Sequence, residues 1–162
     1  MKELVVREGI SLLDIPSGEA VYGIVLPTAK QLTKDGFGIA TQKDTYRANR
    51  IFKIARKIGE YTTEYGARVF YLGTYTNPSG GKFRLFSFPV KDKYKDISDA
   101  TIISESCTQL VSTLQKYKVD KCLLPIIGDD LGISSFANCI KPVLEVSFDD
   151  SFIMIHYTPG SK

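Results

Sequence analysis

Leu124-Pro125-Ile126-Ile127-Gly128-Asp129-Asp130-Leu131-Gly132 is the stretch that decides the fold of this 162-residue chain. Residues 121–127 are mostly apolar and predict a buried strand. The glycine loop after them leads to Ser134, which can cap a helix over residues 134–147 with an expected kink near Pro142. A buried strand, a glycine loop and a helix in this order are typical of an α/β protein.

The same alternation continues on both sides of this stretch. Further strands are predicted at residues 10–13, 20–26, 68–72, 83–90 and 152–157, the second ended by Pro27 and the next two joined as a hairpin through the turn at 75–81. Helices are predicted at residues 39–58 and 103–114, the latter capped by Ser98 or Asp99. We therefore expect a three-layer α/β/α fold with a mixed, largely parallel sheet, and one domain over residues 1–162.

The composition excludes several classes of protein. With 43% hydrophobic and 24% charged residues the chain reads as globular, and no apolar run approaches the roughly 20 residues of a membrane span. The first residues lack the pattern of a signal peptide. The three widely spaced cysteines fit neither a disulfide framework nor a zinc site, which favours a reducing, cytoplasmic location. We expect no metal, no cofactor and no membrane partner.

The net charge of +3 comes from the first half of the chain, where residues 1–81 hold 11 basic and 8 acidic residues. Most of the excess lies at residues 43–57, at a spacing that puts the basic side chains on one face of a helix: Lys43, Arg47, Arg50, Lys53 and Lys57. We interpret this face as solvated. We expect nucleic acid only as a substrate context and not as a general binding partner, because the basic stripe has no continuation in the second half.

Two loops carry the pattern of a phosphate site. Residues 34–40 and 127–134 are glycine-containing loops placed before helices, where free backbone N–H groups can bind anions. Ligands of open α/β sheets collect at such loops. If the two loops face each other, they form a diphosphate clamp built from backbone.

Five segments, in this order, resemble the macro domain family: Gly9-Ile10-Ser11-Leu12, residues 20–27, Gly36-Phe37-Gly38-Ile39-Ala40, residues 86–92 and residues 124–132. The resemblance covers residues 9–158. It is strongest, at residues 87–94, to the branch that includes hydrolases for ADP-ribosylated DNA, for glutamate-linked ADP-ribose and for ADP-ribose 1″-phosphate.

The resemblance implies a pocket for ADP-ribose and gives its residues. Ile10, Ser11 and Tyr157 would lie at the adenine. The diphosphate and the distal ribose would lie within the two loops, at Gly36, Phe37, Gly38, Ile39, Gly128, Asp129, Asp130, Leu131 and Gly132.

The chain departs from the family at positions that matter for chemistry. Ile10-Ser11 stands where the family commonly has an aspartate that binds the adenine amino group. Ala29 lies near the position at which the family has an asparagine that touches the distal ribose. Gly73 and Gly132 fall where some members have a lysine and an aspartate. The candidates left for catalysis are Lys91, Asp129 and Asp130. The two aspartates would repel a diphosphate unless they turn to solvent or meet a cationic group on the ligand.

Two other side chains, a histidine and a cysteine, are of types that act in catalysis. His156 lies in an apolar segment and is interpreted as a structural residue. Cys122 begins a buried strand and is interpreted as core, with no obvious histidine partner.

Three functions remain open at this point. The first is a binding module that holds, and in one version sequesters, ADP-ribose or a derived conjugate or nucleotide signal. The second is a hydrolase that removes ADP-ribose from protein, nucleic acid or 1″-phosphate. The third is a degenerate macro-like module for protein interaction.

Overall fold

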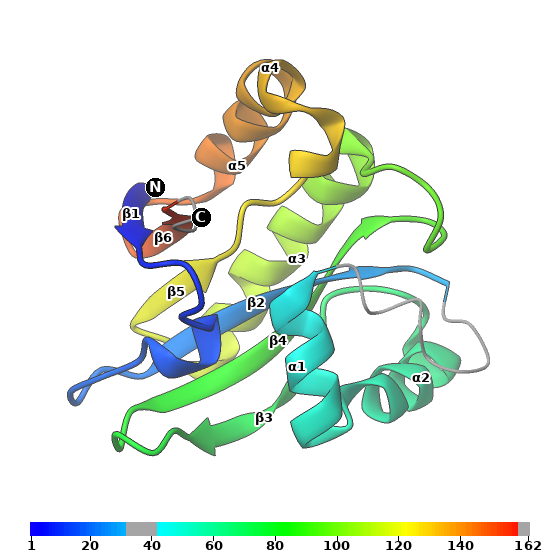
Figure 1. Cartoon of the computed structure of the whole chain (residues 1–162). Coiled ribbons are helices and arrows are strands. Elements are labelled where there is room, and N and C mark those ends of the chain that lie inside the picture. The colour runs from blue at the N-terminus through cyan, green and yellow to red at the C-terminus, as the bar shows by residue number, and fades with distance from the viewer. Residues whose placement is uncertain (32–41, 159–162) are drawn as a thin grey trace.

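The computed structural model describes residues 1–31 and 42–158, apart from the side chains of Asp129 and Ile133. Its centre is a six-stranded sheet in the order β1-β6-β5-β2-β4-β3, with helices on both faces (Figure 1). All neighbouring strands are parallel except β3 and β4. The predicted α/β fold with a largely parallel sheet is therefore confirmed.

The elements have the following bounds. The strands are β1 (Lys2–Val6), β2 (Tyr22–Ala29), β3 (Tyr71–Thr76), β4 (Lys82–Lys91), β5 (Lys121–Leu124) and β6 (Phe152–Tyr157). The α-helices are α1 (Lys43–Phe52), α2 (Ile54–Tyr65), α3 (Ala100–Tyr117), α4 (Ile133–Ser135) and α5 (Lys141–Ser147). Short 3-10 turns lie at η1 (Leu12–Asp14) and η3 (Asp129–Leu131), and η4 (Phe136–Ile140) is a π-helical turn.

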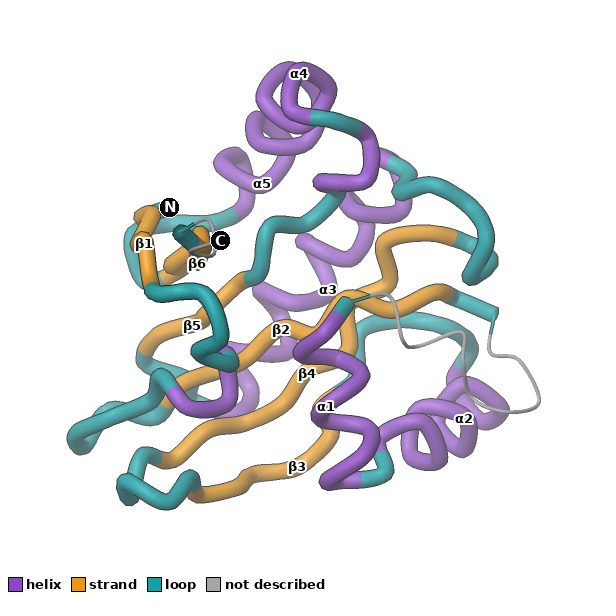
Figure 2. The backbone as a smooth tube through the Cα atoms, viewed as in Figure 1, coloured by secondary structure: helices purple, strands orange, loops and turns teal. Residues whose placement is uncertain are grey.

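Both faces of the sheet are covered, as the tube in Figure 2 shows. Along β2, Val25 belongs to one apolar core, with α3 and α5, whereas Ile24 and Leu26 belong to a second core, with η1, α1 and α2. Successive side chains of a strand point to opposite faces, so a central strand buried on both sides is apolar throughout. Cys122, 1% exposed, lies in the first core, as its position in the sequence predicted.

The predicted strand at residues 10–13 is wrong. Ser11 instead begins η1, because its Oγ accepts a hydrogen bond from the Leu13 N–H at 3.2 Å and so caps a helical turn. Leu12 and Leu13 then bury their side chains from a turn rather than from a strand. The strand at this edge of the sheet is β1, which pairs with β6.

Strand β2 also runs further than predicted, through Pro27 to Ala29. Its pairing with β5 ends at Ile24, whereas its pairing with β4 continues through Pro27. Proline is tolerated where a strand has a neighbour on one side.

The long basic helix predicted at residues 39–58 is divided in two. Lys53 adopts a left-handed conformation with φ 52° and separates α1 from α2. Asn49 stabilises the break, because its backbone carbonyl accepts from the Lys53 N–H and its side-chain oxygen accepts from the Ala55 N–H at 2.9 Å. Because of this break, the side chains of α2 do not continue the basic face of α1.

The other predicted strands and helices are present, with adjusted bounds. Asp99 caps α3 through the N–H groups of Thr101 and Ile102, and β3 and β4 form the predicted hairpin. The last main helix is distorted before Pro142, where the π turn η4 precedes α5. A proline in the first turn of a helix lacks only an N–H that has no partner within the helix.

Candidate functional site

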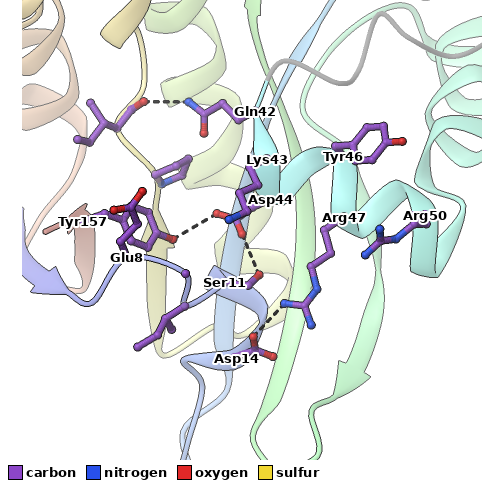
Figure 3. A pocket seen from close by; sticks show the side chains of 14 residues that line it. Glu8, Ser11, Asp14, Gln42, Lys43, Asp44, Tyr46, Arg47, Arg50 and Tyr157 are labelled. Atoms are coloured by element: carbon purple, nitrogen blue, oxygen red, sulfur yellow. Dashed lines mark hydrogen bonds and ion pairs between the residues drawn. The ribbon is translucent and has the colours of Figure 1, made fainter. Parts of the chain in front are cut away.

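A cavity of about 810 Å³ lies where β5 and β6 end (Figure 3). Pro125 and Ile126, which follow β5, and Tyr157, the last residue of β6, line one side. The segment Glu8–Ser11 and the exposed face of α1 line the others. Ligands of open α/β sheets bind at this edge, outside the carboxyl ends of the strands.

Asp44 is the most constrained charged group in the cavity. It lies in the first turn of α1 and is 8% exposed. Its Oδ1 accepts hydrogen bonds from the Ser11 hydroxyl at 2.8 Å and from the Leu12 N–H at 3.3 Å, and its Oδ2 accepts from the Tyr157 hydroxyl at 3.3 Å. Three donors from two other elements thus hold this carboxylate at the cavity wall.

Tyr157 donates to Asp44 and is partly exposed in the cavity. Burial raises the pKa of the Tyr157 hydroxyl above its usual range, and the neighbouring Asp44 carboxylate raises it further. The hydroxyl therefore stays protonated at neutral pH and acts as a donor to the carboxylate.

Side-chain contacts fix the walls of the cavity relative to one another. Ser11 joins η1 to α1, because its hydroxyl donates to Asp44 while accepting from Leu13. Gln42 joins the start of α1 to the end of β5, because its Nε2 donates to the Ile126 carbonyl at 2.9 Å. The start of α1 is therefore held from both sides.

A basic wall follows along α1. Lys43, Arg47 and Arg50 line the cavity, and Arg47 Nη1 lies 2.9 Å from Asp14 Oδ2 of η1. Lys43 and Arg50 are exposed and Arg47 is half-buried, so this face is solvated as interpreted, but it is also part of the cavity wall. Lys57 of the same stripe lies beyond the break at Lys53 and instead donates to the Leu72 carbonyl at 2.9 Å.

The residues expected at the adenine are brought together. Ile10, Ser11 and Tyr157 come from opposite ends of the chain and line the same cavity. Of the loop at residues 34–40, the expected site residues Gly36, Phe37, Gly38 and Ile39 lie outside the described residues.

The second glycine loop, from Gly128 to Gly132, is not part of the lining that the described residues give this cavity. Gly128 has φ 81°, and a Cβ atom there would meet Ile140 Cγ1 at 3.0 Å, so the backbone packs tightly against η4. Gly132 has φ 90°, and Leu131 is half-buried against the core on the α3 side.

The three catalytic candidates have other surroundings. Asp130 is exposed, and its Oδ2 accepts a hydrogen bond from the Ser98 N–H at 2.9 Å. The Asp129 side chain lies outside the described part of the structure. Lys91 ends β4, and its Nζ lies 5.8 Å from the centre of the Tyr94 ring. Lys91 and Asp130 are absent from the described lining of the cavity.

His156 makes a structural contact, with Nε2 3.1 Å from Glu3 Oε1 on β1. Cys122 lies in the core, where burial raises the pKa of its thiol. Among the described residues, no group of three or more histidine, cysteine or acidic side chains is arranged to hold a metal ion. No helix in the described ranges is both long and apolar enough to span a bilayer.

Sequence reasoning missed Asp44 and Gln42, and it grouped the basic residues of α1 without assigning them to a cavity. The one available signal for Asp44 was an acidic residue in the first turn of a helix, which is a common stabilising position. Its partners Ser11 and Tyr157 are 33 and 113 residues away in the chain. No local pattern could place them beside it.

No protein-family model and no curated protein matches the chain in sequence. Its fold nevertheless matches solved structures. The macrodomain of Thermus aquaticus DarG superposes with a TM-score of 0.58 at 20% identity, over 97% of this chain and 98% of the other. A macrodomain protein from Streptomyces coelicolor gives a TM-score of 0.64 at 14% identity, over 98% of this chain and 100% of the other.

A third match was solved with a ligand. The structure of Thermosipho africanus DarTG in complex with ADP-ribose superposes with a TM-score of 0.59 at 12% identity. The match covers 84% of this chain and 38% of that longer chain.

Proposed function

The chain has the macrodomain fold, and from this premise we propose that its cavity binds ADP-ribose or an ADP-ribose-derived conjugate. The adenine lies between Ile10, Ser11, Asp44 and Tyr157. The diphosphate leads toward the start of α1, where the first N–H groups of the helix and Lys43 favour an anion. Loops 36–39 and 128–132 remain the proposed diphosphate contacts.

The observation that carries the proposal is the hydrogen bonding of Asp44. A carboxylate offers about four acceptor positions. In the described part of the chain Oδ1 accepts two hydrogen bonds and Oδ2 accepts one, from Tyr157. Oδ2 therefore has room for one further donor from the cavity, and the exocyclic amino group of adenine is such a donor.

Asp44 would thus supply what Ile10 cannot. The resemblance puts an adenine-binding aspartate in the region of Ile10-Ser11, and neither residue has a carboxylate. Asp44 reaches the same end of the cavity from α1, with Ser11 as the link between the two segments. A carboxylate would thus still bind the adenine amino group, but it would come from α1.

A solved structure of similar fold supports the choice of ligand. The Thermosipho africanus DarTG structure is of a complex with ADP-ribose, and that chain shares 12% identity with this one. Binding is proposed rather than turnover, because the catalytic candidates Lys91 and Asp130 have contacts elsewhere.

The test compares two bases on two proteins. Titration calorimetry of the wild-type chain is expected to show tighter binding of ADP-ribose than of its hypoxanthine analogue, which has a carbonyl in place of the amino group. The hydrogen bond to a charged acceptor corresponds to roughly ten- to a hundredfold in affinity. Asp44→Asn turns an amide N–H toward the base and is expected to reverse the preference.

Tyr157→Phe is the matched variant. It keeps the ring but removes the donor to Asp44, so the preference for adenine should persist. Equal binding of both bases by the wild-type chain would contradict the role of Asp44. No binding of ADP-ribose at millimolar concentration would contradict the proposed function.

A further inference from the structure

The cavity continues along α1 beyond the end that contacts Asp44. Arg47 and Arg50 follow Asp44 by three and six residues on the same helix and line the same cavity. At 1.5 Å rise per residue they lie about 4.5 and 9 Å further along the axis, away from the start of α1. In Figure 3, Gln42 is drawn above Asp44, and the two arginine side chains are drawn to the right of Asp44.

The two arginines have donors to spare. A guanidinium has five N–H donors. Arg47 contacts Asp14 through Nη1 at 2.9 Å, and within the described chain Arg50 has no ion-pair partner. The lining at this end of the cavity thus holds two guanidinium groups and the carboxylate of Asp14, which gives an excess of positive charge.

We infer that this end of the cavity is a subsite for a phosphate carried on the adenosine ribose, at its 2′ or 3′ hydroxyl. The inference rests on the proposed function, which puts the adenine at Asp44. The diphosphate leaves the adenosine from the 5′ position toward the start of α1. Only a group attached elsewhere on the adenosine can then reach the opposite end. Arginine is suited to this task because its planar fork binds phosphate through two hydrogen bonds.

The arrangement also accounts for Asp14. Its carboxylate holds Arg47 in the cavity and at the same time competes with any anion for that guanidinium. An incoming phosphate must share or displace this contact. Removing the charge of Asp14 should therefore favour a phosphorylated ligand, whereas removing the charge of Arg47 should disfavour it.

The experiment measures two ligand pairs by calorimetry. ADP-ribose against ADP-ribose 2′-phosphate tests the 2′ position, and adenosine 5′-monophosphate against adenosine 3′,5′-bisphosphate tests the 3′ position. The wild-type chain is expected to bind one phosphorylated member at least tenfold more tightly than its partner, as a charge-assisted contact would give.

Variants assign the effect to the arginines. The Arg47→Gln/Arg50→Gln double variant should lose the tenfold difference, and Asp14→Asn should widen it. Arg56→Gln is the control, because it removes the same charge from α2. Arg56 pairs there with Glu60 and is not among the residues that line the cavity. It should keep the difference.

Three results would overturn the inference, and they are distinguishable. If ADP-ribose binds but neither extra phosphate strengthens binding, the subsite is wrong and the proposed function stands. If the double variant weakens all ligands equally, the arginines hold the common 5′ phosphates instead. If the wild-type chain binds none of the ligands, the proposed function fails, and the subsite with it.

Discussion

Replacing Ser11 with alanine tests the contact on which the site is built. The hydroxyl makes two hydrogen bonds, one donated to Asp44 Oδ1 at 2.8 Å and one accepted from the Leu13 N–H at 3.2 Å. The first is charge-assisted, for which about 1.5–3 kcal/mol is typical. The second caps η1, and losing a cap costs about 1 kcal/mol.

The two contributions together are about 2.5–4 kcal/mol, but the net loss of stability is smaller because Asp44 lies beside the cavity. Water can reach Asp44 from the cavity and replace part of the lost contact. We therefore expect the free energy of unfolding to fall by about 2 kcal/mol, which for a chain of this size corresponds to a melting temperature lower by about 4–8 °C.

The assay is thermal and urea unfolding of the variant beside Ser17→Ala. Ser17 lies in an exposed position close by, so the same chemical change there should cost less than about 0.5 kcal/mol. A double-mutant cycle with Asp44→Asn should give a coupling energy of about 1 kcal/mol or more, because the hydroxyl then meets a neutral partner. Equal loss in Ser11→Ala and Ser17→Ala, or no coupling to Asp44, would refute the reasoning.

Three further outcomes are expected. Gly81→Ala should destabilise the fold by several kcal/mol in urea unfolding, because its Cβ would lie 2.0 Å from the Pro16 carbonyl oxygen. With a thiol reagent the native chain should react quickly at exposed Cys139 alone, while the two buried cysteines react only after unfolding. Because the pKa of Tyr157 is raised in the folded state, its contribution to stability is complete below about pH 10 and is lost as the pH rises further. Melting temperatures measured against pH should therefore fall less steeply above about pH 10 in Tyr157→Phe than in the wild-type chain.

The sequence predicted the sheet better than the turns. Runs such as β4 and β6 are apolar on both faces and long enough to be recognised, and Asp99 marks the start of α3 by a local capping pattern. The sequence of residues 10–13 is compatible with a strand and with a turn. The turn forms because Ser11 caps the residues that follow it, and a hydrogen bond to the buried Asp44 holds the Ser11 side chain in place.

The site was predictable only in part for a related reason. Helical spacing put Lys43, Arg47 and Arg50 on one face, and this grouping is correct. Spacing does not say whether a face looks toward solvent or toward a cavity. That depends on η1, which lies beside α1 and supplies Asp14 as a partner for Arg47.

The short turn η1 therefore does more than bury two leucines. It contacts two residues of α1, Asp44 through Ser11 and Leu12 and Arg47 through Asp14, and these two residues lie about one helical turn apart. The first belongs to the proposed adenine end and the second to the proposed phosphate end. Both ends share one rigid helix, so their spacing is fixed by its rise and not by a flexible loop. Asp14→Asn releases only the second contact, whereas Ser11→Ala loosens η1 as a whole. A ligand that spans both ends should thus be affected by either change, and a ligand that occupies only the adenine end should be affected mainly by Ser11→Ala.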